Sequence, residues 1–306
     1  MVERDPPGNT RWSVVWTRGK GCPELANLLA AEAASRVAAD LHASCIEARA
    51  DLLVARRLTS FNLIPVAVPH EFAPSAVRAV VAAVAGGPHS LLAAQVADRL
   101  GGALGVPTSL VTISPNVDSD DQAEAALRRA AALIPAPEAR VVRAANPGTA
   151  VRALPAGSLL VLGVSGGTWW RRQLFGPGPR LRAGAPAGVV MVRTAPRRCF
   201  QEMGDPSAMG RQMPAGEALR LTTEAVVPVA ENGHLIGLVR RRAMEAASPT
   251  VTLDSLMEPP SSVRLDDSLA TVAEVADLFE GAPVPVVDAD GRLCGLLPLS
   301  PPAPTR

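Results

Sequence analysis

Short apolar runs and amphipathic segments alternate between residues 77 and 194. Five runs have strand character, namely VRAVVAAVAGG from Val77, PTSLVTIS from Pro107, Ala139–Ala144, Ser158–Val164 and Gly188–Arg193. The segments between them are helical in pattern, namely 88–105, Asp120–Leu133, Pro147–Leu154 and about 177–183. Strands that alternate with helices need crossover connections, so this pattern predicts an α/β fold, a five-stranded parallel Rossmann-like sheet covered on both faces. Ligands of such sheets bind beyond the carboxyl ends of the strands.

Residues 1–70 form an extension whose role the sequence does not indicate. Arg11–Thr17 has the composition of a short strand and is followed by a glycine turn at 19–21. From Pro23 to about Leu58, apolar residues recur at helical spacing, which predicts one long amphipathic helix or two shorter ones. Prolines at 65, 69 and 74 interrupt any regular element and predict a boundary near 65–75.

A repeat marks the C-terminal part of the chain. VVPVAENGHLIGLV at 226–239 and VPVVDADGRLCGLL at 284–297 share a strand, an acidic and glycine-containing turn, and a second strand. Each copy lacks a full core and must pack on the other. We therefore expect an α/β domain over 77–194, a linker at 195–212, a small α+β domain over 213–300 with copies at about 213–247 and 250–300, and a tail at 301–306.

The composition and net charge of the chain argue against nucleic acid and membranes as ligands. The chain has 306 residues and a formal net charge of +1, with 48% hydrophobic, 19% charged and 3% aromatic residues. This charge gives no field that recruits nucleic acid or an anionic membrane, and no apolar run is long enough to span one. The start of the chain lacks a secretory signal, so we expect a cytoplasmic protein that binds small molecules. The four cysteines form no metal-ligand spacing.

Glycines gather where two of the expected strands end. Their backbone amides can approach phosphates closely, and His89 opens a helix whose amides favour an anion. The candidate nucleotide-binding residues are Gly86, Gly87, His89, Gly163, Ser165, Gly166, Gly167 and Gly176. The alternatives are glycines that only make turns and a polar residue that only caps a helix. Arg171 and Arg172 in the intervening loop can pair with phosphate or remain solvated.

These glycines and their strand context resemble the ATP-binding universal stress proteins over about 77–194. The resemblance implies ATP as a ligand and a role in a stress response. Two positions depart from the family pattern. Ala85 replaces the usual Asp at the end of the first strand, and Pro177 replaces the Ser or Thr that follows the last glycine. Both changes remove polar groups that the family uses near the nucleotide.

The C-terminal repeat resembles a CBS pair, or Bateman module, over about 205–300. The residues that carry the resemblance are VVPV at 226–229, LMEPP at 256–260, DSL at 267–269 and VPVVD at 284–288, with Gly233, Gly237, Gly291 and Gly295. The resemblance implies an adenine nucleotide, ATP or AMP, in the cleft between copies, and signalling to a partner. Its candidate cleft residues are Val229, Gly237, Arg240, Val287 and Gly295.

Both copies depart from the adenosine-binding pattern after the last glycine. The positions that usually hold Ser or Thr and then Asp are Arg240 and Ala243 in the first copy, and Pro298 and Pro301 in the second. The alternative to ligand binding is therefore a dimerisation or docking module. The basic run at 240–242 can hold a phosphate or start a solvated helix.

The sequence contains no nucleophile elbow, HExxH, P-loop or kinase motif. We therefore expect a regulatory protein that is not an enzyme and requires no cofactor, senses ATP or AMP, and signals to an unknown protein partner. The alternative is a scaffold with decayed nucleotide sites. The stacking of CBS pairs and the apolar run Gly188–Arg193, interpreted as a free sheet edge, both predict a homodimer.

Overall fold

The computed structural model describes residues 12–30, 35–58, 62–114, 120–135, 138–144, 147–164, 185 and 187–299. The chain separates into two compact units, unit 1 at residues 1–195 and unit 2 at 196–306, which we describe one at a time. Within the described ranges, no helix has the length and apolar character needed to cross a bilayer.

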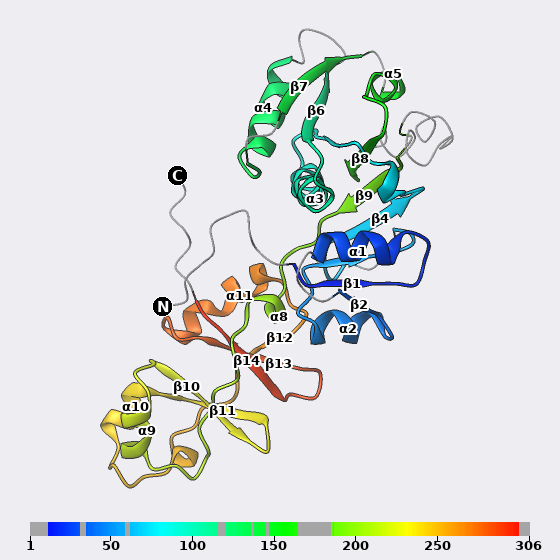
Figure 1. The fold of residues 1–306 in the computed structure, drawn as a ribbon. Coiled ribbons are helices and arrows are strands. Elements are labelled where there is room, and N and C mark those ends of the chain that lie inside the picture. The colour runs from blue at the N-terminus through cyan, green and yellow to red at the C-terminus, as the bar shows by residue number, and fades with distance from the viewer. Residues whose placement is uncertain are drawn as a thin grey trace. The chain divides into compact units, whose positions relative to one another are not determined.

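Unit 1 contains a nine-stranded sheet in the order β2-β1-β3-β4-β9-β8-β5-β6-β7 (Figure 1). All neighbouring strands run parallel except β4 and β9, which are antiparallel. The strands are β1 Val14–Trp16, β2 Ser35–Val37, β3 Leu52–Val54, β4 Val66–His70, β5 Ala79–Ala83, β6 Thr108–Ser114, β7 Glu138–Arg143, β8 Ser158–Gly163 and β9 Val189–Arg193. The helices are α1 Cys22–Ala30, α2 Leu41–Glu47, α3 Pro88–Leu104, α4 Asp120–Ala131 and α5 Pro147–Arg152, with a 3₁₀ turn η1 at Pro74–Ala76.

The five strands predicted between 77 and 194 are β5 to β9. Alternate residues of these strands face opposite cores, because side chains on a strand point to alternating faces. Val80 and Ala82 pack with α1 and α3, whereas Val81 packs with Val151 of α5 on the other face. The predicted helix at 177–183 lies outside the described residues. The predicted sheet is incomplete, since four further strands extend it beyond β9.

Of the expectation of one long amphipathic helix or two shorter ones from Pro23 to about Leu58, two short helices are confirmed, but the remainder was wrong because the segment also contains strands. The described residues of the segment contain the short helices α1 and α2, with β2 between them and β3 after them. Leu52, Leu53 and Val54 are all buried, which three consecutive residues achieve in a strand covered on both faces but not on one side of an amphipathic helix. The change from helical to strand periodicity was missed because alanine and leucine are frequent throughout the segment.

The strand β9 is not an edge, which corrects the reason given for a homodimer through Gly188–Arg193. β9 pairs with β8 on one side and with β4 on the other, in the register Val66 opposite Arg193 and His70 opposite Val189. The backbone groups expected to be free for a second copy are therefore bonded within the same chain.

The registers of unit 1 repeat around this antiparallel pair. Val14 lies opposite Leu52 and Ser35 as Val80 lies opposite Leu159 and Thr108. In the same way Leu53 lies opposite Val66, and Leu160 lies opposite Val189. Residues 12–70 thus repeat the pairing of β5, β6, β8 and β9, without a counterpart of β7 among the described residues.

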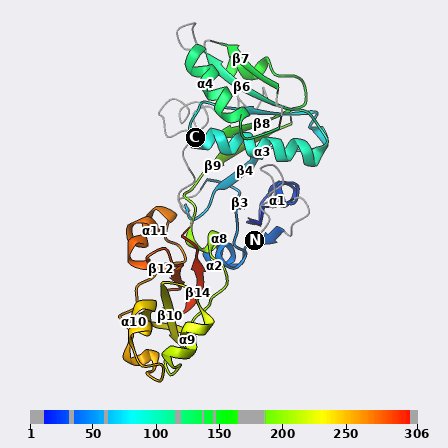
Figure 2. The same cartoon turned by 90° about the vertical axis from the view of Figure 1, so that its left-hand side faces the viewer.

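Unit 2 contains two hairpin-based sheets, one in each copy of the sequence repeat. The first half carries α9 Ala215–Leu221, β10 Val226–Glu231, β11 His234–Arg240 and α10 Arg241–Ala246. The second half carries β12 Val263–Arg264, α11 Leu269–Val275, a 3₁₀ turn η4 Ala276–Phe279, β13 Val284–Val287 and β14 Leu293–Leu297. The helices α9 and α10 lie side by side on the first hairpin (Figure 2). Two short elements precede the halves, α8 Cys199–Glu202 and η3 Leu253–Ser255.

Each half is completed by the segment that precedes the other half. The amide of Cys199 donates to the carbonyl of Asp267, and the amide of Leu253 donates to the carbonyl of Met213 in the same relation. Similarly, the flanking residue Gly204 pairs with Leu296 of β14, and the flanking residue Glu258 pairs with Leu238 of β11. The two halves are thus related by an internal two-fold symmetry in which their preceding segments are exchanged. Each half therefore depends on the other for its fold.

Candidate functional site

A cavity of about 240 Å³ opens in unit 2 where the first half faces the second hairpin. We call it the first cleft. The described residues that line it are Ser207, Ala208, Met209, Met213, Leu221, Thr222, Glu224, Val226, Val227, Pro228, Pro283 and Leu296. Pro283 and Leu296 belong to the second half, so the cleft needs both halves of the pair.

The first cleft is lined mainly by apolar side chains, and Ser207, Thr222 and Glu224 are the polar residues among the described lining. Val226, Val227 and Pro228 are buried and belong to the first strand of the hairpin. Met209 and Met213 are half-buried, and methionine adapts its shape to flat ligands and contacts aromatic rings favourably. Ser207 and Glu224 are exposed at the rim. A few polar groups around an apolar hollow are typical of small-molecule sites.

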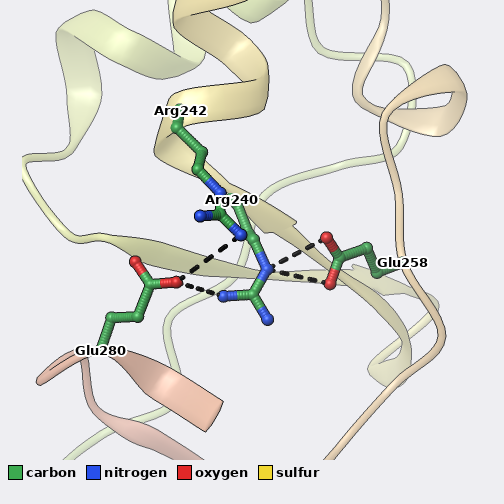
Figure 3. A network of polar contacts seen from close by, with 4 residues as sticks. All are labelled: Arg240, Arg242, Glu258 and Glu280. Carbon is green, nitrogen blue, oxygen red and sulfur yellow. Dashed lines mark hydrogen bonds and ion pairs between the residues drawn. The ribbon is translucent and has the colours of Figure 1, made fainter. Parts of the chain in front are cut away.

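The two-fold relation defines a position equivalent to the first cleft, at which the two halves exchange roles, and we call this position the second cleft. The residue equivalent to Thr222, four positions before the hairpin, is Glu280, and the equivalent of Leu296 is Leu238. In this second cleft the guanidinium of Arg240 contacts both carboxylate oxygens of Glu258, at 3.0 and 3.1 Å, and a Glu280 oxygen at 2.5 Å (Figure 3). Arg242 contributes a longer contact of 3.9 Å to Glu280.

This network gives the clefts different electrostatic characters. The hydrogen bonds that Arg240 donates to Glu258, and the negative charges of Glu258 and Glu280, raise the pKa of Arg240, so its cation is retained. At the equivalent positions around the first cleft stand Pro298, Thr222 and Gly204, none of which is charged. Arg240 therefore links the halves across the second cleft, and its guanidinium is already paired with carboxylates there.

None of the predicted cleft residues lines the first cleft, and Arg240 belongs to the second cleft. Val229 and Val287 are buried core residues of the hairpins. At Gly237 an added Cβ would contact Met257 and lie 2.7 Å from the carbonyl oxygen of Glu258. At Gly295 it would lie 2.8 Å from the sulfur of Met203 and also contact the Gly204 carbonyl. These two glycines accommodate the exchanged segments. A role for this set in ligand binding stays a prediction.

The predicted nucleotide residues of unit 1 come together in part. Gly86, Gly87 and His89 follow β5, and Gly163 ends the neighbouring strand β8, at the point where the strand order reverses. A Cβ at Gly163 would lie 2.5 Å from the carbonyl carbon of His89, so the glycine permits this close approach. Ser165, Gly166, Gly167 and Gly176, with the loop arginines, lie outside the described residues.

His89 has a contact that the sequence did not indicate. Its Nδ1 accepts a hydrogen bond of 3.1 Å from the backbone amide of Thr194, which follows β9. Burial, and then the charge of Arg193, lower the pKa of His89, so the neutral imidazole is favoured. Next to it, the hydroxyl of Ser90 accepts a bond of 3.0 Å from the amide of Ala85. At the start of α3, Ser90 is therefore bonded to the residue before the glycine-rich turn, and His89 is bonded to the segment after β9.

The cysteines remain separate in the structure. Cys22, Cys45, Cys199 and Cys294 are all free, and burial raises the pKa of Cys45 to about 12 and that of Cys199 to about 11. Within the described parts of the chain, no three His, Cys, Asp or Glu residues are grouped as metal ligands would be.

Sequence reasoning did not identify the residues that line the first cleft. Met209 and Met213 lay in a segment interpreted as a connector, although a parallel bridge from Met209 to Val229 gives this segment the place that β12 has in the second half. Alignment of the repeat beyond the hairpins, upstream to this segment, was the signal available for finding it.

Several solved structures resemble part of the chain. They include the cytosolic domain of the Mg²⁺ channel MgtE in complex with ATP, with 24% identity, a TM-score of 0.31 and coverage of 43% of this chain and 56% of that one. The CBS-pair protein CBSX2 from Arabidopsis thaliana has 23% identity, a TM-score of 0.30 and coverage of 34% and 89%. A CBS domain pair/ACT domain protein from Thermotoga maritima has 18% identity, a TM-score of 0.31 and coverage of 34% and 90%.

Similarities of this size do not establish a family. The chain also spans only about half of the MgtE domain that it resembles. No protein-family model matches the chain, and no curated protein matches it in sequence. The two-fold exchange of segments and the first cleft are therefore described from the strand registers and contacts of this chain, and not from these similarities.

Proposed function

We propose that unit 2 is a CBS-like pair that binds one adenine compound in its first cleft and regulates a partner according to occupancy. The observation that carries this proposal is the cavity itself, lined mainly by apolar side chains with a few polar ones and built from both halves of the repeat. AMP and ATP are the candidates that the sequence resemblance implies.

The first cleft is built from residues of both halves, and this supports a regulatory role. Leu296 lines the cleft, and its carbonyl accepts a hydrogen bond of 2.8 Å from the amide of Gly204, which belongs to the segment preceding the first half. A ligand that contacts Leu296 and Val227 together would favour one arrangement of the halves over others, which is how binding energy shifts a conformational equilibrium. The connection to a partner would pass through these exchanged segments.

A scaffold without a ligand is the second candidate, and the Arg240 network favours it. The guanidinium in the second cleft is already paired with Glu258 and Glu280 and is not free for a phosphate. Neither half keeps the carboxylate that the family pattern places near the ribose, since Ala243 and Pro301 stand there. On this reading the pair would act by docking or by homodimerisation.

For unit 1 we propose a universal-stress-protein-like role with a second ATP site at the ends of β5 and β8. Support comes from the order β9-β8-β5-β6-β7, whose reversal between β5 and β8 brings Gly86, Gly87, His89 and Gly163 together. Binding there would require Thr194 to share or release the imidazole of His89.

The binding proposal is tested by calorimetric titration of the full chain with adenosine, AMP and ATP. The variant Ala208→Trp places an indole in the first cleft at an exposed lining residue, and Ala246→Trp is the matched control on the exposed end of α10. We expect one ligand per chain, lost in Ala208→Trp and kept in Ala246→Trp. If none of the three compounds binds, the binding proposal fails and the scaffold function is favoured.

A further inference from the structure

We propose that the first cleft selects an adenine compound without phosphate, such as a free nucleoside, and that Glu224 disfavours phosphorylated forms. This inference rests on the proposed function, in which the first cleft is the ligand site, and it changes the ligand class from the nucleotides that the resemblance implies. Charge, cavity size and the pairing of the neighbouring arginines carry it.

The first observation is the sign of the charge at the cleft. Glu224 is the one ionisable side chain among the described residues that line the cavity, and it is exposed at the rim. A carboxylate at that place repels a phosphate bound nearby, and the repulsion weakens as salt screens it. An uncharged nucleoside does not meet this repulsion.

The second observation is that nearby arginines are occupied by protein groups. Arg241 donates to the carbonyl of the lining residue Thr222 at 2.7 Å, and its Nε lies 2.8 Å from Glu245. Arg211 contacts Asp254 at 2.9 Å and Glu231 at 3.3 Å, and the charge of Asp254, followed by the contact with Glu231, raises its pKa. A phosphate in the first cleft that paired with Arg241 or Arg211 would have to compete with these protein groups.

The third observation is the size of the cavity. A volume of about 240 Å³ lies below the range of about 300–1,000 Å³ that is usual for ligand pockets. Such a volume suits a base with part of its sugar. The half-buried Met209 and Met213 offer thioethers for contact with a flat ring, which needs no charge.

The test compares the affinities of adenosine and AMP for the full chain at low and at physiological salt. We expect adenosine to bind on the order of tenfold more tightly than AMP at low salt, and the ratio to shrink as salt is added. The variant Glu224→Gln removes the charge and keeps the shape, so it should bring the two affinities close together. Glu217→Gln, on the exposed surface of α9 outside the lining, is the matched control and should leave the ratio unchanged.

The outcomes separate this inference from the function on which it rests. If AMP binds as tightly as adenosine, or if Glu224→Gln leaves the ratio unchanged, the charge selection is overturned while the first cleft remains an adenine site. If neither compound binds to the wild type, the proposed function fails and this inference fails with it.

Discussion

Val68 and Met191 lie directly opposite each other at the centre of the antiparallel pair β4–β9. The pairs on either side of them are equivalent when β4 and β9 are exchanged. Val66 of β4 faces Arg193 of β9, and Val189 of β9 faces His70 of β4. The parallel registers on the two sides of this pair then repeat residue by residue. Unit 1 therefore contains, within one chain, an arrangement that two separate chains would make by joining their last strands.

Removal of residues 1–76 should expose β9 and cause self-association. Four of the five residues of this strand are buried in the full chain, and without β4 its backbone groups would lack partners on one side. Light scattering coupled to gel filtration should give a larger assembly for the shortened chain than for the full one.

A synthetic peptide of residues 62–73 provides the control, because it can restore the β4 pairing in trans. We expect it to reverse the extra association. Equal masses for the shortened and full chains would show that β4 does not protect this edge.

The exchanged segments of unit 2 can be tested at two equivalent glycines. Gly237→Ala and Gly295→Ala each place a methyl group against a flanking segment, and overpacking of this kind costs about 1–3 kcal/mol of unfolding free energy. Gly210→Ala is the control, since no atom lies within 4 Å of its added Cβ. Urea denaturation followed by circular dichroism measures all three. Similar midpoints for the wild type, Gly237→Ala and Gly295→Ala would contradict the exchange.

The partial burial of His89, whose Nδ1 accepts the bond from Thr194, predicts a loss of stability in acid. The folded-state pKa of His89 is lowered from its ordinary value of 6.5, so the unfolded state binds the proton more readily. The contribution to stability is then complete above pH 6.5 and is lost as the pH falls through the lower folded-state pKa. Denaturation midpoints between pH 8 and pH 5 should fall more for the wild type than for His89→Gln. Parallel curves for the two proteins would exclude this linkage.

The sequence was sufficient to predict strands where one local period persists. Runs such as Ser158–Gly163 and Val189–Arg193 are short, apolar and bounded by turn residues, so the strands β8 and β9 could be located to within a residue or two. The hairpins at 226–240 and 284–297 were visible because their turns repeat the same acidic and glycine pattern.

Pairing between distant strands could not be predicted in this way. β4 contains Pro69, which indicated a boundary, yet the strand lies between β3 and β9 in the sheet. The lining of the first cleft combines Met209 with Leu296, residues brought together only when the flanking segments exchange. Arg240 was a candidate cleft residue in a basic run that could hold a phosphate or start a solvated helix. Its carboxylate partners Glu258 and Glu280 lie in the segment before β12 and in the turn before β13, which the sequence did not connect with it.

The central claim, that the first cleft is the ligand site, is tested most directly by methyl NMR of the full chain labelled at methionine. Met209 and Met213 line the cleft, whereas Met244 is buried in the core of the first half and Met191 lies in unit 1. On titration with adenosine we predict saturable shifts of the Met209 and Met213 methyl signals, while those of Met244 and Met191 stay in place. Unchanged Met209 and Met213 signals at saturating adenosine, or shifts confined to Met191, would contradict the account.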